Sequence, residues 1–325
     1  MKAAVCRRYG PPEVVEIVEV PTPEPKGNEV LIRVRATTVS SADWRMRSLD
    51  LPKGFGLFGR LMLGILRPRQ PVLGTELAGE IASVGKTVTR WKPGDRVFAF
   101  PGAGGGAHAE FRVMPEDGKL AAIPDGLDWA TAAALSFGGT TALDFLRDKA
   151  GLKAGERVLV VGASGAVGNA AVQIARHLGA HVTGVTSGGN AGLVRELGAD
   201  AVIDYGREDF RQMEQRWDVI LNASDHVRFA DAVKVLNPGG RLVLVLASLP
   251  QMLQSLLPKR RDGKRMVVGV AAERPADLRL LAELAARGVY KPLIDSTFPF
   301  ERIVEAHARV DTGRKRGSVV VFLGG

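Results

Sequence analysis

The order of apolar and polar positions divides the chain into two kinds of sequence. Up to about residue 124, short stretches such as 14–20 and 29–36 alternate apolar with polar residues, and proline or glycine turns separate them. Alternation with a period of two is typical of strands that expose one face. Further strands are expected at 78–84 and 96–100, so this part predicts a small barrel-like β domain.

From about residue 125, apolar strand patterns alternate with helical spacing. Six strands joined by crossovers of this length predict an α/β domain with a parallel, doubly wound sheet. A helical pattern over 129–147 precedes it, and we expect an interruption at Gly138-Gly139. The strands are expected at 157–161, 181–186, 201–204, 217–222, 240–246 and 265–270, with helices at 168–178, 190–197 and 226–236.

The last fifty or so residues do not continue this alternation. They predict a helix at 276–287, a strand at 293–298, a second helix at 301–311 and a final strand at 318–323. We expect this tail to return to the first domain. The predicted organisation is therefore a β-rich substrate domain of residues 1–124 and 273–325, and a nucleotide-binding domain of residues 125–272.

A glycine turn in the second domain has the spacing of a dinucleotide-binding site. The turn Gly162-Ala163-Ser164-Gly165-Ala166-Val167-Gly168 follows one predicted strand and opens a helix. Glycines there permit a sharp turn, close approach of a pyrophosphate and tight packing of helix on strand, while the helix N-terminus attracts phosphates. The first two glycines are one residue further apart than in the usual motif, and an ordinary strand-to-helix turn is the alternative.

The end of the next strand bears on which nucleotide is bound. NAD-specific folds usually carry an acidic residue there, which binds the adenosine ribose. Here the strand runs into Ser187-Gly188-Gly189-Asn190, which has no carboxylate and offers hydrogen-bond donors to a 2′-phosphate. The pattern favours NADP(H), although the same residues are common in turns.

Composition narrows the class of protein. The formal net charge of +9 fits an anionic partner: a nucleotide phosphate, an acidic membrane surface or nucleic acid. Cys6 is the single cysteine, which excludes an intrachain disulfide and a multi-cysteine metal site and favours a reducing cytoplasm. Neither a signal-peptide pattern nor an apolar run long enough to span a bilayer is seen in the sequence.

Two segments leave several interpretations open. The stretch Gly54–Arg69 is apolar with arginines at intervals, and it fits a lid over an apolar pocket, a partner surface or an interfacial membrane segment, or a segment tucked against its own domain. Three internal glycines weaken any helix there. The basic run 258–265 suggests RNA binding or a solvated loop, and its lack of aromatic residues counts against RNA.

Short segments in a fixed order along nearly the whole chain carry a family resemblance. Together they resemble the medium-chain dehydrogenase/reductase superfamily, and specifically its zinc-free quinone oxidoreductase branch, the ζ-crystallin type. The segments are Val39-Ser40-Ser41-Ala42-Asp43-Trp44-Arg45-Met46-Arg47, Gly74-Thr75-Glu76-Leu77-Ala78-Gly79, Lys92-Pro93-Gly94-Asp95-Arg96-Val97, Ala107-His108-Ala109-Glu110-Phe111, Gly139-Thr140-Thr141-Ala142, Gly162–Gly168, 197–205 and 313–317.

The resemblance implies a GroES-like substrate domain, a Rossmann domain and NADPH in the cleft between them. It further implies adenosine-phosphate contacts at Ser187, Asn190 and Tyr205, with Lys315 or Arg316 from the tail. Many relatives carry Lys or Arg where this chain has Gly188-Gly189, which weakens the prediction of NADPH over NADH. A homodimer is expected from relatives.

The zinc-containing branch differs at the positions that would bind the metal. It places a cysteine near Ser40-Ser41, a histidine at the position of Thr75 and four clustered cysteines elsewhere. Because this chain has none of these ligands, the resemblance implies a zinc-free enzyme and excludes a mechanism in which zinc lowers the pKa of an alcohol.

The chemistry expected is hydride transfer from NADPH to a quinone, or to the β-carbon of an enone or alkenal. We expect Ser41, Asp43, Trp44, Phe55 and Phe58 to border the acceptor. Ser41, Asp43 and Trp44 are the catalytic candidates, and Asp43 is either an acid or a structural carboxylate. His108 is expected to be structural or on the surface, and solvent can supply the proton. Residues expected to face the nicotinamide are Thr141, Leu246, Ala247 and Ser248.

Overall fold

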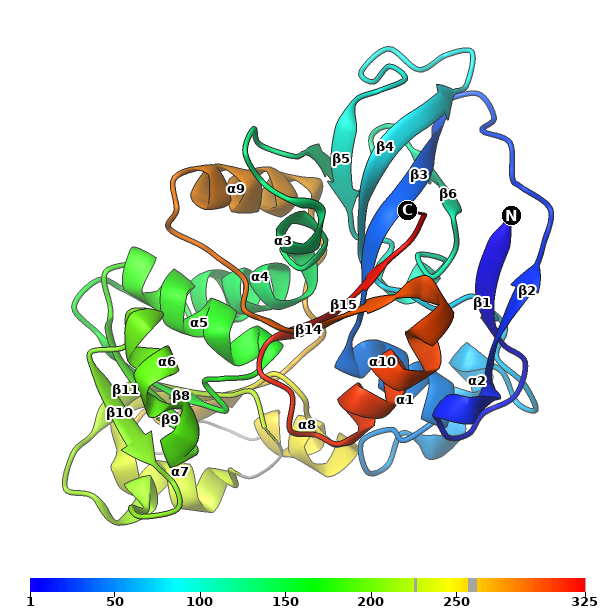
Figure 1. The fold of residues 1–325 in the computed structure, drawn as a ribbon. Helices are drawn as coiled ribbons and strands as arrows, with labels where there is room; N and C mark the ends of the chain where they lie inside the picture. The colour runs from blue at the N-terminus through cyan, green and yellow to red at the C-terminus, as the bar shows by residue number, and fades with distance from the viewer. Residues whose placement is uncertain (225–226, 257–261, 325) are drawn as a thin grey trace. The chain divides into compact units, whose positions relative to one another are not determined.

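The computed structural model describes residues 1–224, 227–256 and 262–324, and these form two compact units. The first unit contains Met1–Leu51, Gly56–Phe137 and Glu273–Gly325, and the second contains Pro52–Phe55 and Gly138–Ala272 (Figure 1). Residues 125–137, placed in the second domain by the sequence pattern, group with the first unit.

The second unit is built on a parallel sheet of six strands, as predicted. The strand order is β10-β9-β8-β11-β12-β13, and every paired neighbour is parallel. The chain adds β9 and β10 on one side of β8 and then β11, β12 and β13 on the other side, which is the arrangement of a doubly wound Rossmann sheet. The strands are β8 (Arg157–Val161), β9 (His181–Thr186), β10 (Ala201–Asp204), β11 (Trp217–Asn222), β12 (Leu236–Leu244) and β13 (Arg265–Val267).

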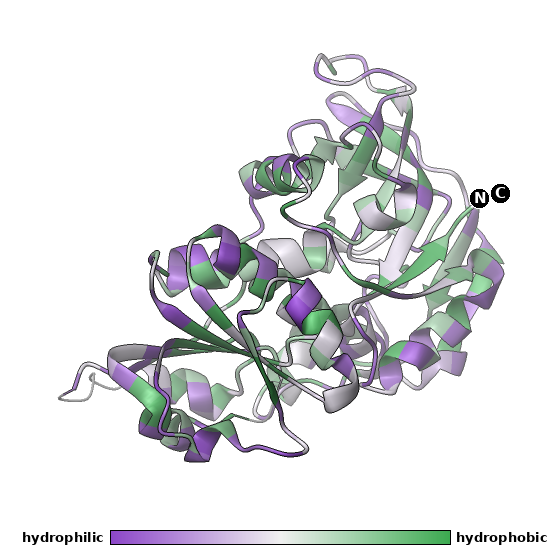
Figure 2. Ribbon diagram, turned by 60° about the vertical axis from the view of Figure 1, so that its left-hand side comes forward, coloured by the Kyte–Doolittle hydropathy of each residue, from purple (hydrophilic) through white to green (hydrophobic). Residues whose placement is uncertain are grey.

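Helices cover the sheet because its central strands are apolar on both faces. Figure 2 shows these strands in the green of hydrophobic residues. Leu159, Ile220 and Leu242 on neighbouring strands belong to one buried cluster. The covering helices include α5 (Ala166–His177), which packs on β8 and β9, α6 (Ala191–Glu196) on β9 and β10, α7 (Phe229–Val235) on β12 and α8 (Leu249–Ser255) on β13.

The helical stretch before this sheet is interrupted earlier than predicted. Helix α3 (Trp129–Ala133) ends before Leu135, and α4 (Ser136–Leu143) then runs straight through Gly138-Gly139 into a π-helical turn, Asp144–Lys149. A Cβ at Gly138 would lie 2.4 Å from the Ala166 carbonyl oxygen. This glycine therefore permits close helix packing and does not break the helix, so the predicted interruption was wrong.

The first unit contains a seven-stranded sheet and a separate two-stranded hairpin, β1 (Lys2–Cys6) with β2 (Val15–Glu19). The long strand β3 (Glu29–Val39) pairs with β4, β6 and β15. The C-terminal tail thus returns to the first unit, as expected. The other strands of the sheet are β4 (Leu77–Val84), β5 (Arg96–Ala99), β6 (Phe111–Pro115), β7 (Leu120–Ala122), β14 (Ile294–Pro299) and β15 (Ser318–Phe322).

Four further helices complete this unit. Helix α10 (Ile303–Asp311) fills its core with Ile303, Ala306 and Val310. Helix α1 (Ser41–Ser48), which the sequence pattern did not reveal, is joined to α10 by the buried Arg47, whose guanidinium pairs with the Asp311 carboxylate at 2.5 Å. The remaining two are α2 (Gly56–Leu63) and α9 (Pro275–Ala286). Among the helices that the structure describes, none is long and apolar enough to cross a membrane.

Candidate active site

The turn between β8 and α5 gives each of its glycines a different role. Gly162 has φ +82°, a left-handed conformation that favours glycine. A Cβ at Gly168 would lie 2.0 Å from the Gly162 carbonyl oxygen, so the helix packs against the turn only without a side chain there. Gly165, the N-cap of α5, has extended backbone, and the single atom near a Cβ would be the Gly162 oxygen at 3.4 Å.

The open space at Gly165 fits a bound pyrophosphate. The first turn of a helix leaves backbone N–H groups without helical acceptors, and its positive end attracts anions. Here that end belongs to α5, a helix of 12 residues that follows the carboxyl end of a parallel strand. The residues present therefore fit the dinucleotide site predicted from the sequence.

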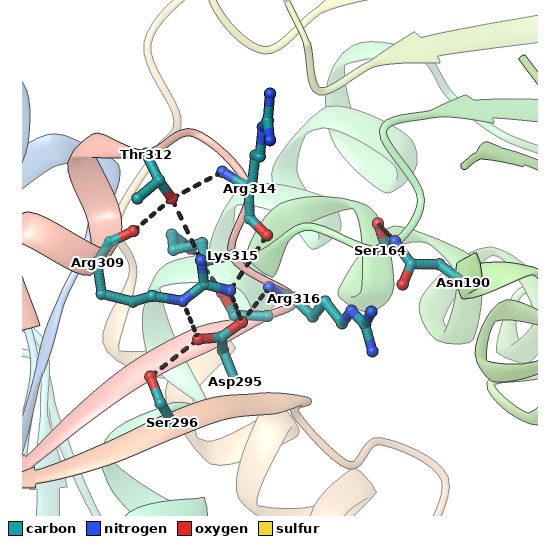
Figure 3. A network of polar contacts seen from close by, with 10 residues as sticks. Ser164, Asn190, Asp295, Ser296, Arg309, Thr312, Arg314, Lys315 and Arg316 are labelled. Atoms are coloured by element: carbon teal, nitrogen blue, oxygen red, sulfur yellow. Dashed lines mark hydrogen bonds and ion pairs between the residues drawn. The ribbon is translucent and has the colours of Figure 1, made fainter. Parts of the chain in front are cut away.

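Hydrogen bonds connect this turn to the end of β9. The Ser164 hydroxyl oxygen accepts from the Thr186 hydroxyl at 3.0 Å and from the Asn190 amide at 3.3 Å, a contact shown in Figure 3. The Asn190 amide also donates to the Ser187 hydroxyl at 3.1 Å. Its carbonyl oxygen is buried and accepts no hydrogen bond from the described residues. Ser187 and Asn190 thus lie beside the glycine turn, and the contacts with an adenosine phosphate that the resemblance implies stay a prediction.

A carboxylate that sequence reasoning missed lies at the same place. Asp204 ends β10, which pairs with β9 so that Asp204 is opposite Thr186. A Cβ at Gly188 would lie 2.4 Å from Asp204 Oδ2, and the other carboxylate oxygen accepts the Gly206 N–H at 3.0 Å. The acid lies on β10, the strand next to β9, so a pattern that expects it at the end of β9 itself does not reveal it.

The other predicted nucleotide contacts in the second unit occupy varied environments. Tyr205 is 67% exposed, and Thr141 is buried in α4. Leu246 and Ala247 follow β12 and are half-buried. Ser248 caps α8, where its hydroxyl donates to the Gln251 side chain at 2.9 Å.

In the first unit, two residues at the positions of the zinc ligands contact each other. The hydroxyl oxygens of Ser40 and Thr75 lie 3.2 Å apart. Asp43 is fully buried beside them, and its carboxylate accepts the Ser40 N–H and hydroxyl at 2.8 and 2.6 Å and the Gly74 N–H at 2.9 Å. These bonds form a capping box at the start of α1 and fix Asp43 as a structural carboxylate.

The predicted acceptor-binding residues are spread over several elements. Ser41 is the first residue of α1 and is half-buried. Trp44 packs partly on the core, with the Arg45 guanidinium 4.8 Å from its ring centre. Phe58 lies on α2 and is 59% exposed, whereas Phe55 belongs to the second unit.

Glu76 is the buried acid next to Thr75. It is 1% exposed, and its two carboxylate oxygens accept the Thr38 hydroxyl and the Phe137 N–H, each at 2.6 Å. Burial raises the pKa of Glu76 to about 7, because removal from water disfavours the charged form more than the two hydrogen bonds favour it. Burial also raises the pKa of the nearby Tyr290 hydroxyl.

The tail residues predicted to bind phosphate surround Asp295. Figure 3 shows the Asp295 carboxylate accepting from the Arg309 guanidinium at 2.8 and 2.6 Å and from the Arg316 N–H at 2.7 Å. The Arg316 side chain is exposed. Lys315 is half-buried with its amine donating to the Gly317 carbonyl at 2.5 Å, and burial lowers its pKa to about 8.

His108 is buried, which agrees with a structural histidine and not with one on the surface. Its Nε2 lies 2.9 Å from the Thr38 carbonyl oxygen, and its ring meets His307 edge to face at 5.4 Å. Both ring nitrogens of the buried His307 lack hydrogen-bond partners among the described residues, and burial lowers its pKa well below the usual value.

The described residues contain no cluster of three or more histidine, cysteine, aspartate or glutamate side chains placed to hold a metal ion. Residues 258–261 of the predicted RNA-binding run 258–265 lie outside the described residues.

Comparisons with known proteins agree with this architecture. Residues 26–125 match the alcohol dehydrogenase GroES-like domain family, and residues 197–321 match a family described as zinc-binding dehydrogenase. The chain is 32% identical over 324 residues to a chloroplast envelope quinone oxidoreductase homolog of Arabidopsis thaliana, covering 94% of this chain and 93% of that protein.

Two further proteins are similar over nearly the whole of this chain. The chain is 31% identical over 334 residues to a 2-methylene-furan-3-one reductase of Solanum lycopersicum, covering 99% of this chain and 79% of that protein. The structure of the quinone oxidoreductase from Coxiella burnetii superposes with a TM-score of 0.86 at 26% identity, covering 100% of this chain and 99% of the other.

A GroES-like unit joined to a Rossmann unit whose glycine turn fits a dinucleotide defines an NAD(P)H-dependent oxidoreductase of the medium-chain dehydrogenase/reductase superfamily. Within that superfamily, the chain belongs to the quinone oxidoreductase family.

Proposed function

We propose that this protein is an NADPH-dependent, zinc-independent reductase that transfers a hydride to a quinone or another electron-poor acceptor. The observation that carries the proposal is the glycine turn at the end of β8. Its open N-cap position at Gly165 and the hydroxyl of Ser164 suit the phosphates of a dinucleotide. When bound, the nicotinamide would supply the hydride.

Zinc independence rests on the donor groups at the metal-ligand positions. Ser40 and Thr75 present neutral hydroxyls that hydrogen-bond to each other, and Asp43 is held by backbone and hydroxyl donors. Zinc sites in proteins use thiolate, imidazole and carboxylate ligands. The residues at these positions instead hold the start of α1 in place. The reaction we propose therefore requires an acceptor that takes a hydride without a Lewis acid.

The choice of NADPH depends on a balance of groups around one turn. Ser187, Asn190 and the exposed Tyr205 offer hydrogen-bond donors to a 2′-phosphate. The Asp204 carboxylate beside Gly188 opposes a second negative charge there and suits a ribose hydroxyl instead. We therefore propose NADPH as the preferred nucleotide and Asp204 as the group that keeps NADH competitive.

A second acceptor class is supported by the relative named for a 2-methylene-furan-3-one, which has an activated double bond. An enone or alkenal takes the hydride at its β-carbon and a proton afterwards, so the same scaffold would serve. The two acceptor classes differ in the product, not in the nucleotide half of the reaction.

The test is oxidation of NADPH and NADH with an ortho-quinone, a para-quinone, an alkenal and a simple aldehyde, before and after chelator treatment. We expect turnover of a quinone or the alkenal that prefers NADPH and survives the chelator. Turnover of the aldehyde alone, lost with the chelator, would contradict zinc independence. Nucleotide binding without any turnover would contradict a reductase.

A further inference from the structure

The segment after α1 forms an apolar surface, which includes Phe58, one of the residues expected to border the acceptor. We define the α2 surface as Leu57, Phe58, Leu61, Met62, Ile65 and Leu66, whose exposed fractions run from 51% for Leu61 to 90% for Leu66. Large apolar side chains this exposed and this close together are unusual on a soluble protein and mark an interaction site.

Local contacts hold this surface in a fixed shape. The inner side of α2 rests on Leu51, and a Cβ at Gly59 would lie 1.9 Å from a Leu51 methyl carbon. The glycine therefore lets the helix lie close to the unit and directs its large side chains outward. After the helix, the Gly64 carbonyl accepts the Tyr9 hydroxyl at 2.7 Å. The Arg69 N–H donates to the Leu63 carbonyl at 2.7 Å, which folds the segment back on the helix end.

The charged residues within the segment 51–75 are all positive. Arg60, Arg67 and Arg69 are exposed, and none forms an ion pair with a residue that the structure describes. The sequence has no aspartate or glutamate between Asp50 and Glu76. Arg60 instead donates to the Ile65 carbonyl at 2.8 Å, at the edge of the apolar residues.

We infer that the α2 surface docks the protein on an anionic lipid membrane. A short helix with exposed apolar residues and basic residues at its margin lies in the membrane interface, where side chains such as leucine reach the acyl boundary. Arginine side chains extend from there to lipid phosphates. The net charge of +9 adds long-range attraction to such a surface.

The same charges argue against a second copy of the chain as the occupant. A twofold contact places the same patch on both sides. Two α2 surfaces face to face would bring Arg60, Arg67 and Arg69 of each copy together, without an acidic residue in the segment to offset them. An anionic membrane supplies both the apolar layer and the opposite charge.

The test is co-sedimentation with vesicles of phosphatidylcholine alone or mixed with phosphatidylglycerol, at low and high salt. We expect binding to the anionic vesicles that weakens with salt. Ile65→Gln with Leu66→Gln should reduce partitioning at least about tenfold. Arg67→Gln with Arg69→Gln should reduce it about fivefold for each charge removed.

Matched controls separate docking from loss of fold. Val270→Gln with Phe322→Gln removes two side chains that are 85% and 40% exposed outside residues 54–69, and partitioning should not change. Thermal unfolding should agree among all variants. Absence of binding to anionic vesicles, or equal loss in the control pair, overturns the inference. Self-association of the wild type that disappears in the Ile65/Leu66 variant would assign the surface to a second copy.

Discussion

The ionisation of Glu76 differs clearly from that of a free glutamic acid. Its carboxyl is buried between a hydroxyl donor and a backbone donor, and its pKa is about 7. Because a native pKa above the unfolded value means that the folded protein binds more protons, this group destabilises the fold as pH rises from about 4.5 to about 7. Above that range its contribution no longer changes.

Substitution of Glu76 by glutamine should remove this pH dependence. A glutamine retains both hydrogen bonds, with its carbonyl accepting from Phe137 and its amide donating to the Thr38 hydroxyl. The difference in unfolding free energy between variant and wild type should shift in favour of the variant by on the order of 3 kcal/mol between pH 4.5 and 7. Urea unfolding across this range measures it, and a pH-independent difference would contradict the assignment.

His307 makes the unfolding free energy depend on pH in the opposite direction. Its pKa is lowered in the fold, so the unfolded chain binds the additional proton and stability falls as pH drops below the usual value of 6.5. Comparing Glu76→Gln with wild type cancels this second effect, because His307 is the same in both proteins.

Asp204 is the residue through which nucleotide preference can be tested. Replacing Asp204 with asparagine removes a negative charge beside Gly188, so we expect NADPH to bind about tenfold more tightly relative to NADH. The measurement is direct titration of each nucleotide by fluorescence or calorimetry. Glu208→Gln makes the same change of charge at an exposed neighbouring position and should leave the ratio unchanged.

The two outcomes of the Asp204 titration have different meanings. An unchanged ratio with tight binding of both nucleotides would remove Asp204 from the recognition of the ribose. Failure of the wild type to bind either nucleotide would instead contradict the proposed reductase itself.

At the level of elements, two glycines of the turn between β8 and α5 should affect different properties: Gly165 nucleotide binding, and Gly168 stability. Gly165→Val should abolish NADPH binding while leaving thermal stability nearly unchanged, since its Cβ enters open space on extended backbone. Gly168→Ala should instead lower the melting temperature by several degrees, because the new methyl group meets the Gly162 carbonyl. Calorimetric titration and thermal unfolding test the pair. Full NADPH affinity in Gly165→Val would contradict the placement of the pyrophosphate.

The elements that sequence periodicity predicted well are those with continuous apolar strands. The strands at 157–161, 181–186, 201–204 and 217–222 match β8 to β11 residue for residue. The short helices α1 and α2 were harder to predict from the sequence, because α1 has polar residues throughout and α2 contains glycines. Capping by Ser40 and Asp43 stabilises α1, and contact of Gly59 with Leu51 favours α2, so tertiary and capping contacts outweigh weak local preference.

At the scale of the whole molecule, the first unit is assembled from both ends of the chain. β15 pairs with β3, and Phe300, Ile303 and Val321 from the tail complete its core. The second unit is continuous in sequence except for Pro52–Phe55. The stability of the first unit therefore depends on residues 273–325 as well as on residues before 138.

A chain that ends at Ala272 should lose the first unit and keep the second. We expect hydrogen exchange to remain slow in β8, β9 and β11, which pair within the second unit, and to become fast in β3 and β4. Mass spectrometry of peptides from the truncated and full chains makes the comparison. Slow exchange in β3 of the truncated chain would contradict the role assigned to the tail.

The sequence by itself determined the two kinds of domain, the parallel sheet, the glycine turn between strand and helix and the return of the tail, because apolar periodicity and glycine spacing are local properties of the chain. Only the tertiary structure decided that Asp204 reaches the turn after β9, that Asp43 is occupied in a capping box and that the α2 surface is exposed. These depend on strand register and packing between segments distant in sequence, which a one-dimensional pattern does not encode.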